Sequence, residues 1–418
     1  MRKLLYIAIV VLLAISCEKE TEHRAKNTVV YIQTNNYQDN QNAVLAYRHK
    51  EDGTLEAVPG SPFLTGGAGL GNPKQILGPA DSDTEIKISK DGKFLLAVNS
   101  GSNTIAVMRI QSNGGLTPVE GSPFPSGGQT PVSIDVYNKH VFVVNKSQDP
   151  LHTINQNPNY ITFTIDNNGR LTQVPDSKVE TFAGSSPAQA LVSNNGKFLF
   201  GADFLGFMLN PPKGTLRSFT INSSGTITPV AGTPQSIPGM GGALGLWQHP
   251  KENILYVGFP MQAKLGIYDI NSASGALTFQ STVEAGGGIC WVRTNKNGDK
   301  LYLLNSAENT VGMYNSSAPM SPSSLGKLKL KESGPTYVDM EMEFPTSQPF
   351  SLGFSPSEKY LYVVNQHTNP DFSVGNYNYF HVLHVAEDGR LTEPGEPLQL
   401  PVPNIYRPRG IAVIQTSL

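Results

Sequence analysis

The sequence predicts an all-β protein folded as a seven-bladed β-propeller, with four-stranded antiparallel blades and a first blade closed by the C-terminal strand. Three observations lead to this fold. A glycine-containing turn phrase occurs seven times, a hairpin phrase accompanies most copies, and the chain ends in a strand without a partner in its own unit. Glycine (41) and proline (31) are abundant and charged residues make up only 15%, which is typical of short strands joined by tight turns.

The first phrase is a polar turn, a glycine, any residue, and then Leu or Ile at the start of a short strand. Asp52-Gly53-Thr54-Leu55 and Gly169-Arg170-Leu171 are clear copies, and Gly326-Lys327-Leu328 is a weaker one. The apolar positions 55, 116, 171, 227, 277, 328 and 391 lie 50 to 63 residues apart. Because each structural repeat contributes one such phrase, seven copies predict seven units.

The second phrase is a polar hairpin followed by an apolar strand, most clearly over Asp91–Asn99. Asp-Gly and Asn-Gly suit two-residue hairpins because these turns need positive φ. A third strand follows, as over 104–110 and 216–221, and an innermost strand precedes the hairpin, as over 132–136. Four strands per unit make the blade of a propeller. We expect apolar or small residues on both faces of the innermost strands, because neighbouring sheets sandwich them.

The two ends of the chain predict how the ring closes. The first unit begins at Val29–Ile32 and lacks an innermost strand, whereas Gly410–Ile414 is an apolar strand with no unit of its own. The last strand therefore completes the first blade and removes a free sheet edge. The alternatives are an open array and a sandwich of hairpins, but a sandwich does not explain seven copies and an open array does not need the terminal strand.

The first 16 residues have the pattern of a bacterial export signal. Two basic residues precede an apolar run over 4–15, which is long enough for a signal-peptide core and short for a membrane span. The run ends in Leu13-Ala14-Ile15-Ser16-Cys17, which resembles the lipobox of lipoproteins, although Ala14 stands where Leu is usual. We predict a signal peptide over 1–16 and a lipid on Cys17. The alternatives are a secreted protein cleaved near Ser16 and an uncleaved anchor.

The rest of the chain divides into a tether and one domain. Residues 17–27 comprise the lipidated Cys17 and a charged stretch that reads as a flexible tether, and 28–418 form the propeller. Cys290 is the only other cysteine and lies in an apolar segment, so we predict a buried thiol and no structural disulfide. The protein is expected in the cell envelope, lipid-anchored at the outer membrane, on either the periplasmic or the exterior side.

Composition narrows the partners. Lys plus Arg (31) nearly balance Asp plus Glu (33), which does not favour nucleic acid. No metal-ligand spacing, phosphate loop or Ser-His-Asp pattern stands out, so we predict no metal and no cofactor. The expected partners are the membrane, through the lipid anchor, and a small lactone, a glycan or a protein. The chain is expected to be a monomer.

Candidate functional residues lie in loops around one mouth of the central channel. That mouth is lined by the links between blades and by second-to-third strand loops, three of which are unusually long, at 146–159, 203–213 and 366–378. A histidine and a carboxylate can share acid and base work, and the alternative is an ordinary solvated loop side chain. The candidates are His152, His367, Asp203 and Asp371.

Several blade phrases resemble the seven-bladed lactonase family, which includes 6-phosphogluconolactonases and carboxymuconate-lactonising enzymes. The likeness extends from Val29 to the C-terminus and implies the fold more directly than the chemistry, because the phrases describe blades. The phrases are Gly114–Val119 with Gly121–Phe124, Lys93–Asn99 with Ser102–Val107, and Lys359–Asn365.

The resemblance implies a Gly-Pro-Arg-His segment before one inner strand and a Pro-His-x-His segment before another, which supply charge and proton donors to a lactone carboxylate. Neither motif is present: the corresponding positions include Gly241–Leu244 and Gly286–Ile289. The nearest basic segment is Tyr406-Arg407-Pro408-Arg409-Gly410. Arg407 and Arg409 are therefore the candidate anion holders, since arginine binds carboxylate or phosphate through two parallel hydrogen bonds. The alternative is a surface arginine pair beside a proline.

Two functions follow from these observations. The resemblance implies a hydrolase of a small sugar-type or carboxylated lactone, whereas the missing histidine motifs favour a non-catalytic propeller that binds a glycan, peptide or protein through its loop face. A redox propeller is a third class, but the sequence has no cysteine pair for haem attachment. The blade phrases alone do not separate the first two functions.

Overall fold

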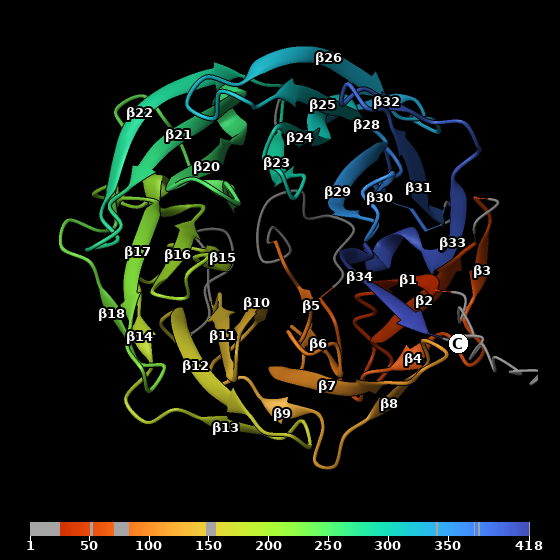
Figure 1. Ribbon diagram of the computed structural model, residues 1–418, viewed down its shortest axis with the longest axis horizontal. Helices are drawn as coiled ribbons and strands as arrows, with labels where there is room; N and C mark the ends of the chain where they lie inside the picture. Colours follow the sequence, from red (N-terminus) through yellow and green to blue (C-terminus); the bar gives the residue numbers. More distant parts are fainter. Residues whose placement is uncertain are drawn as a thin grey trace, which may run out of the picture.

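The computed structural model describes residues 26–50, 53–70, 83–147, 156–339, 342–371, 373–374 and 377–417. The predicted signal peptide, Cys17 and His152 lie outside these residues. The strands form seven blades around a common axis (Figure 1), so the predicted seven-bladed all-β fold is confirmed. Within the described ranges, no helix is long and apolar enough to cross a membrane.

Each blade is an antiparallel sheet whose four main strands follow one another from the axis outward. Blade 1 contains β34 (Arg409–Ser417), β1 (Lys26–Gln33), β2 (Ala43–His49) and β3 (Leu55–Ala57). Blade 2 contains β5 (Ile86–Ile88), β6 (Phe94–Asn99), β7 (Thr104–Ile110) and β8 (Leu116–Pro118). Blade 3 contains β10 (Pro131–Tyr137), β11 (His140–Asn145), β12 (Asn159–Ile165) and β13 (Leu171–Gln173). Blades 4 and 5 contain β15 (Pro187–Val192), β16 (Phe198–Asp203), β17 (Leu216–Ile221) and β18 (Ile227–Pro229); and β19 (Leu244–Gln248), β20 (Ile254–Phe259), β21 (Lys264–Ile270) and β22 (Leu277–Glu284). Blades 6 and 7 contain β23 (Ile289–Thr294), β24 (Lys300–Asn305), β25 (Thr310–Asn315) and β26 (Ser323–Lys329); and β29 (Ser347–Phe354), β30 (Tyr360–His367), β31 (Tyr377–Val385) and β32 (Leu391–Thr392).

Some elements lie outside this four-strand pattern. A short extra strand pairs with the third strand of blades 1, 2, 3 and 7, and a hairpin follows blade 6 before the chain enters blade 7. These strands are β4 (Phe63–Leu64), β9 (Phe124–Pro125), β14 (Val179–Glu180), β33 (Leu398–Pro403), β27 (Thr336–Asp339) and β28 (Met342–Pro345). In the part of the chain that the structure describes, four single-turn 3₁₀ helices lie in loops: η1 (Gly206–Met208), η2 (Pro260–Gln262), η3 (Ser306–Glu308) and η4 (Asn404–Tyr406).

The ring closes as the terminal strands predict. β34 pairs antiparallel with β1, with Val30 opposite Val413 and Lys26 opposite Ser417. Figure 1 shows the last strand, in blue, beside the first strands, in red. The closing strand gives blade 1 its inner strand and therefore removes a sheet edge that would otherwise be free to pair.

In the described residues the hydrophobic core consists of seven clusters. Six of them lie between two neighbouring blades, and the largest lies between blades 6 and 7 and extends to residues of blades 4 and 5. In β6, Leu95 and Ala97 pack toward blade 1, while Leu96 and Val98 pack toward blade 3. Successive side chains of a strand point to opposite faces, so every inner blade strand serves two clusters. The fold is therefore stabilised by contacts between blades all around the ring.

The repeated turn glycine has a conformational cause. At all seven positions φ is positive, from +74° at Gly275 to +109° at Gly326, a region that L-residues with a side chain rarely occupy. The turn also ties neighbouring blades together, because the Tyr31 hydroxyl donates to the Gly114 carbonyl at 2.9 Å and Tyr302 donates to Gly389 at 2.9 Å. The phrase that reveals the repeat in the sequence is thus also a contact between repeats.

Candidate functional site

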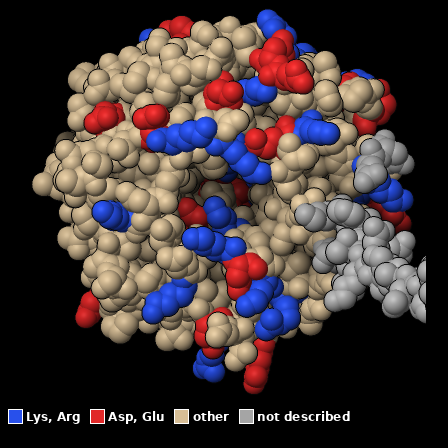
Figure 2. Space-filling model, viewed as in Figure 1, with Lys and Arg blue, Asp and Glu red and all other residues tan. Residues whose placement is uncertain are grey.

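The seven inner strands surround a hollow at the centre of the ring, and Figure 2 shows acidic and basic side chains gathered at its mouth. We call the end where the inner strands begin the loop end, because the blade links and the second-to-third strand loops lie there. The opposite end, where the inner strands turn back into the second strands, is the turn end. The two ends carry different side chains.

A polar network crosses the hollow between four blades. The Arg293 guanidinium of β23 donates to both carboxylate oxygens of Asp83, at 2.8 Å each, although the two residues belong to blades 6 and 2. Gln189 of blade 4 also donates to Asp83, at 3.2 Å. The guanidinium lies 4.7 Å from the ring centroid of Trp247 in blade 5, a cation–π contact that fixes its plane. Parallel hydrogen bonds and stacking together hold Arg293 in one orientation.

Other polar side chains join neighbouring inner strands. Asp135 of β10 accepts from the backbone N–H of Val192 at 2.8 Å and pairs with Lys87 of β5 at 2.8 Å. Gln189 accepts from the Leu246 N–H at 2.5 Å, and Ser351 accepts from the Gly410 N–H at 2.8 Å. The inner strands therefore carry charged and amide side chains in addition to the apolar and small residues that we expected. Inner strands of neighbouring blades do not pair in a ladder, and these side chains accept hydrogen bonds from backbone N–H groups of the next blade.

The loop end brings a buried acid and a buried base to adjacent inner strands. Arg409, the first residue of β34, is 2% exposed and donates to the Asn35 side-chain oxygen at 3.0 Å. Glu85 directly precedes β5 and is 1% exposed. Its Oε2 atom lies 3.4 Å from the position that a Cβ on Gly410 would occupy. The Glu85 carboxylate thus packs against the residue that follows Arg409.

Arg407 is buried as well, so the alternative of a surface arginine pair is wrong. It ends η4 in a left-handed conformation, with φ of +49°. Its carbonyl accepts hydrogen bonds from the side chains of Asn35 and Gln366, both at 3.4 Å. Arg407 and Arg409 are thus close to the same Asn35 side chain, where blade 7 leads into the closing strand.

Asp203 lies apart from this cluster, at the end of β16 in blade 4. It is fully buried and not solvated, because Arg217 binds its Oδ2 through Nε and Nη2 at 2.7 Å. The Tyr160 hydroxyl of blade 3 donates to Oδ1 at 3.4 Å. Burial raises the pKa of Asp203, against the lowering effect of Arg217. These contacts describe an ion pair within blade 4, which the Tyr160 hydroxyl links to blade 3.

His367 is the last residue of β30 in blade 7, and Asp371 lies in the loop that follows. His367 is 7% exposed, and burial lowers the pKa of its imidazole. A hydrogen bond with Asn369 acts in the opposite direction and is the smaller effect. Asp371 is exposed, and its pKa is lowered by hydrogen bonds with the Ser373 side chain and N–H. His367 follows Gln366, whose side chain donates to the Arg407 carbonyl, so His367 borders the region around Arg407 and Arg409. Asp371 stabilises its own turn.

Sequence reasoning did not single out Asp83, Glu85, Lys87, Trp247 and Arg293. A signal was present: Arg293 directly follows the apolar run Cys290–Val292, and residues 83–87 alternate between charged and uncharged side chains before a hairpin. A charged residue within a strand that is expected to be sandwiched predicts a polar network at the axis. Within the described ranges, no three His, Cys, Asp or Glu side chains are placed to hold a metal ion.

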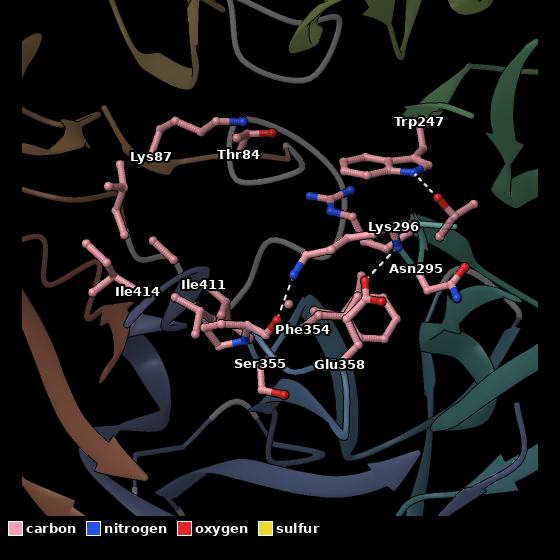
Figure 3. Close-up of a pocket in the computed structure, with 18 of the residues that line it drawn as sticks. Thr84, Lys87, Trp247, Asn295, Lys296, Phe354, Ser355, Glu358, Ile411 and Ile414 are labelled. Atoms are coloured by element: carbon pink, nitrogen blue, oxygen red, sulfur yellow. Dashed lines mark hydrogen bonds between the residues drawn. The ribbon is translucent and has the colours of Figure 1, made fainter. Parts of the chain in front are cut away.

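The turn end contains a pocket of about 660 Å³. Trp247, Arg293 and Lys87 line it together with Lys296 and apolar side chains of β5, β29 and β34. Figure 3 shows Trp247 and Lys87 above Phe354 and Ile411, which come from the opposite side of the pocket. The indole N–H of Trp247 donates to Thr294 at 2.9 Å, which fixes the ring. This volume is in the range of small-molecule sites.

Comparison with known proteins agrees with this architecture. The family model described as Lactonase, 7-bladed beta-propeller matches residues 24–160. A candidate 6-phosphogluconolactonase from Bacteroides uniformis is 14% identical, with a TM-score of 0.66 over 93% of this chain and 99% of its own. The periplasmic gluconolactonase PpgL of Pseudomonas aeruginosa is also 14% identical, with a TM-score of 0.65 over 94% of this chain and 100% of its own. A search of curated protein sequences finds no match.

The fold and the comparisons define the class of the protein as a seven-bladed β-propeller. The match to the lactonase propeller model covers residues 24–160, and the similarity to the solved structures concerns the fold. At these identities the structural likeness concerns the fold, and the site has to be judged from its own residues.

Proposed function

We propose that this protein hydrolyses a small sugar-type or carboxylated lactone at the loop end of its channel. The observation that carries the proposal is the placement of Glu85 and Arg409 on adjacent inner strands, both nearly fully buried, within a lactonase-like propeller. A carboxylate and a guanidinium in a water-poor site supply a proton acceptor and an anion holder, and burial strengthens their interactions.

The reaction assigns one role to each group. Glu85 accepts a proton from water as the water oxygen bonds to the lactone carbonyl carbon. Arg409 donates hydrogen bonds to the oxygen that gains negative charge. The bond between the acyl carbon and the ring oxygen then breaks, the ring oxygen takes the proton from Glu85, and the product is a hydroxy acid. Asn35, which binds Arg409 at 3.0 Å, positions the guanidinium.

A lactone panel tests the proposal with purified residues 28–418. The panel contains gluconolactone, 6-phosphogluconolactone and a carboxylated butenolide, and hydrolysis is followed by proton release. Glu85→Gln should lower kcat by about a hundredfold or more, the usual cost of removing a general base. Arg390→Ala, which removes a guanidinium from an exposed pair with Asp388, is the matched control and should retain full activity. The absence of turnover on the whole panel would overturn the proposal.

A second candidate function, non-catalytic binding through the loop face, is favoured by a different observation. Six large apolar side chains are exposed in the loops and links of that end: Tyr37, Phe182, Met208, Met261, Val338 and Val374. Each of these side chains offers apolar surface that a ligand can cover. If no lactone is hydrolysed, these side chains are the place to look for a glycan or protein ligand.

The lipid anchor on Cys17 remains part of the proposal. β1 begins at Lys26 opposite Ser417, at the turn end, so eight residues separate Cys17 from β1. A segment of this length reaches at most roughly 30 Å, so a lipid on Cys17 would keep the turn end nearer to the membrane than the loop end. Cys17→Ala should move the protein from the membrane fraction to the soluble or unprocessed pool. Unchanged membrane retention and acylation in that variant would disprove the anchor.

A further inference from the structure

The pocket at the turn end is separate from the loop-end residues assigned to hydrolysis. It is lined by the last residues of inner strands and by the turns that follow them, including Thr294–Lys296 and Phe354–Pro356. The Arg293–Asp83 pair lies between the two ends, because Arg293 lines the pocket and Asp83 stands two residues before Glu85. The turn-end pocket therefore needs its own explanation.

The charges that line the pocket are mostly positive. Lys87, Arg293 and Lys296 line it together with a single carboxylate, Glu358. The partner carboxylates of Lys87 and Arg293, Asp135 and Asp83, do not line the pocket, and their side chains are only 7% and 4% exposed. Buried counterions orient the cations and leave the cationic groups facing the cavity. Such an arrangement favours an anionic ligand.

Arg293 retains hydrogen-bonding capacity for a ligand. Within the described part of the chain, Nη1 donates to Asp83 and to the Val292 carbonyl, and Nη2 donates to Asp83, all at 2.8 Å. A guanidinium has five N–H donors, so these bonds use three of them. The bidentate pair and the Trp247 ring hold the guanidinium in place, which lowers the entropic cost of binding.

Much of the remaining wall of the pocket is apolar. Ile86 and Ile88 of β5, Phe354 of β29, and Ile411 and Ile414 of β34 line it. Ile411 and Ile414 are only half-buried in the protein, unlike the core residues of the neighbouring strands. An inorganic anion would leave these walls and most of the 660 Å³ unused. The lining therefore fits a ligand that has both a charged group and an apolar body.

We propose that the turn-end pocket binds a small organic carboxylate, with the carboxylate near Lys87, Arg293 and Lys296 and the apolar body between Trp247 and the isoleucines. Burial of the apolar body contributes free energy in proportion to its area. The cations select the ionised acid over the corresponding alcohol, because only the acid forms charge-assisted hydrogen bonds with them.

The two tryptophans of the chain make a direct test possible. Trp247 lines the pocket, whereas Trp291 is buried against Phe350 with a centroid separation of 4.9 Å. Cyclohexanecarboxylate, which absorbs no light in the tryptophan range, is titrated into purified residues 28–418 while fluorescence is followed. A saturable change is expected in the wild type and in Trp291→Phe, and no change is expected in Trp247→Phe. A response that survives in Trp247→Phe would overturn the proposal.

Charge and ligand controls complete the experiment. Lys87→Gln should raise the Kd by about tenfold, equivalent to about 1.4 kcal/mol. Lys90→Gln is the matched control, because Lys90 lies in the next turn, outside the pocket, and contacts Asn138 at 3.4 Å; its Kd should equal that of the wild type. Equal binding of cyclohexylmethanol, equal Kd values for the two lysine variants, or no saturable change in the wild type would each overturn the proposal.

Discussion

The two ends of the channel are built from the same inner strands but use charged side chains in different ways. At the loop end, Glu85 and Arg409 are almost completely covered by the protein. At the turn end, Lys87 is 35% exposed and lies over a pocket, while its counterion Asp135 is buried. The loop-end charges are thus shielded from bulk water, whereas the Lys87 ammonium is partly open to the pocket.

Both ends of the channel depend on the same ring of blades. The largest expected effect on stability therefore comes from a deletion that opens the ring. Deleting residues 409–417 removes β34, which pairs with β1 along its whole length. The deletion takes away the buried Arg409 and Ala412 and exposes the core between blades 1 and 7. The loss exceeds a total stability of roughly 5 to 15 kcal/mol, so the protein should be unfolded or aggregated. A truncated protein with the melting temperature of the full propeller would contradict the closure.

How far the sequence predicts each region follows from the kind of signal it carries. The turn glycines recur because each needs positive φ, and the apolar strands recur because each serves two interblade clusters. A structural requirement that recurs in all seven blades leaves a repeated pattern, and such a pattern can be recognised in a single sequence. The strand ranges predicted for the third strands, such as 104–110 and 216–221, coincide with β7 and β17.

The channel residues come from single, unrepeated positions in different blades. Asp83 and Arg293 are 210 residues apart and meet only because the ring closes. Nothing in the local sequence pairs them, and the same holds for Lys87 with Asp135. The short inner strand β5 and the hairpin β27–β28 were also not predicted, since each occurs once and departs from the repeat. Contacts across a ring depend on tertiary structure rather than on local pattern.

The next prediction removes the pair that crosses the hollow between the two ends. Asp83→Asn leaves the Arg293 guanidinium without its carboxylate, and Arg293 is only 14% exposed. Loss of one partner from a buried pair should cost about 3 kcal/mol of unfolding free energy, measured by urea denaturation. Asp388→Asn breaks an exposed pair with Arg390 and should leave the urea midpoint unchanged. Equal midpoints for the two variants would show that the crossing pair contributes no stability.

A crossed comparison of two variants tests whether the ends work independently. Glu85→Gln should abolish lactone hydrolysis and leave the Trp247 fluorescence titration unchanged. Lys87→Gln should do the reverse, with about a tenfold weaker Kd for the carboxylate, or about 1.4 kcal/mol, and unaltered kcat. Failure of hydrolysis alone leaves the turn-end site intact, and failure of the titration alone leaves the proposed activity intact. If each variant changes both measurements, the ends are one coupled site.

The smallest expected effect is a pH dependence that also compares the two ends. Burial lowers the pKa of His367 at the loop end and of His249 at the turn end, where His249 Nε2 lies 3.1 Å from the Gly298 carbonyl oxygen. Each folded-state pKa lies below the unfolded value of about 6.5. The neutral form is therefore favoured in the folded protein, and its stabilising contribution is present above that pH and declines as pH falls through and below it.

The melting temperature should therefore fall between about pH 7.5 and about pH 5, above the range in which most carboxylates titrate. His249→Asn and His367→Asn should each show a shallower fall than the wild type, and the double variant should show the shallowest. A residual slope is expected because the pKa of His140 is lowered by burial as well. His384→Asn, on the third strand of blade 7, is the control. Parallel pH profiles for all these proteins would show that neither end of the channel contributes to the pH dependence.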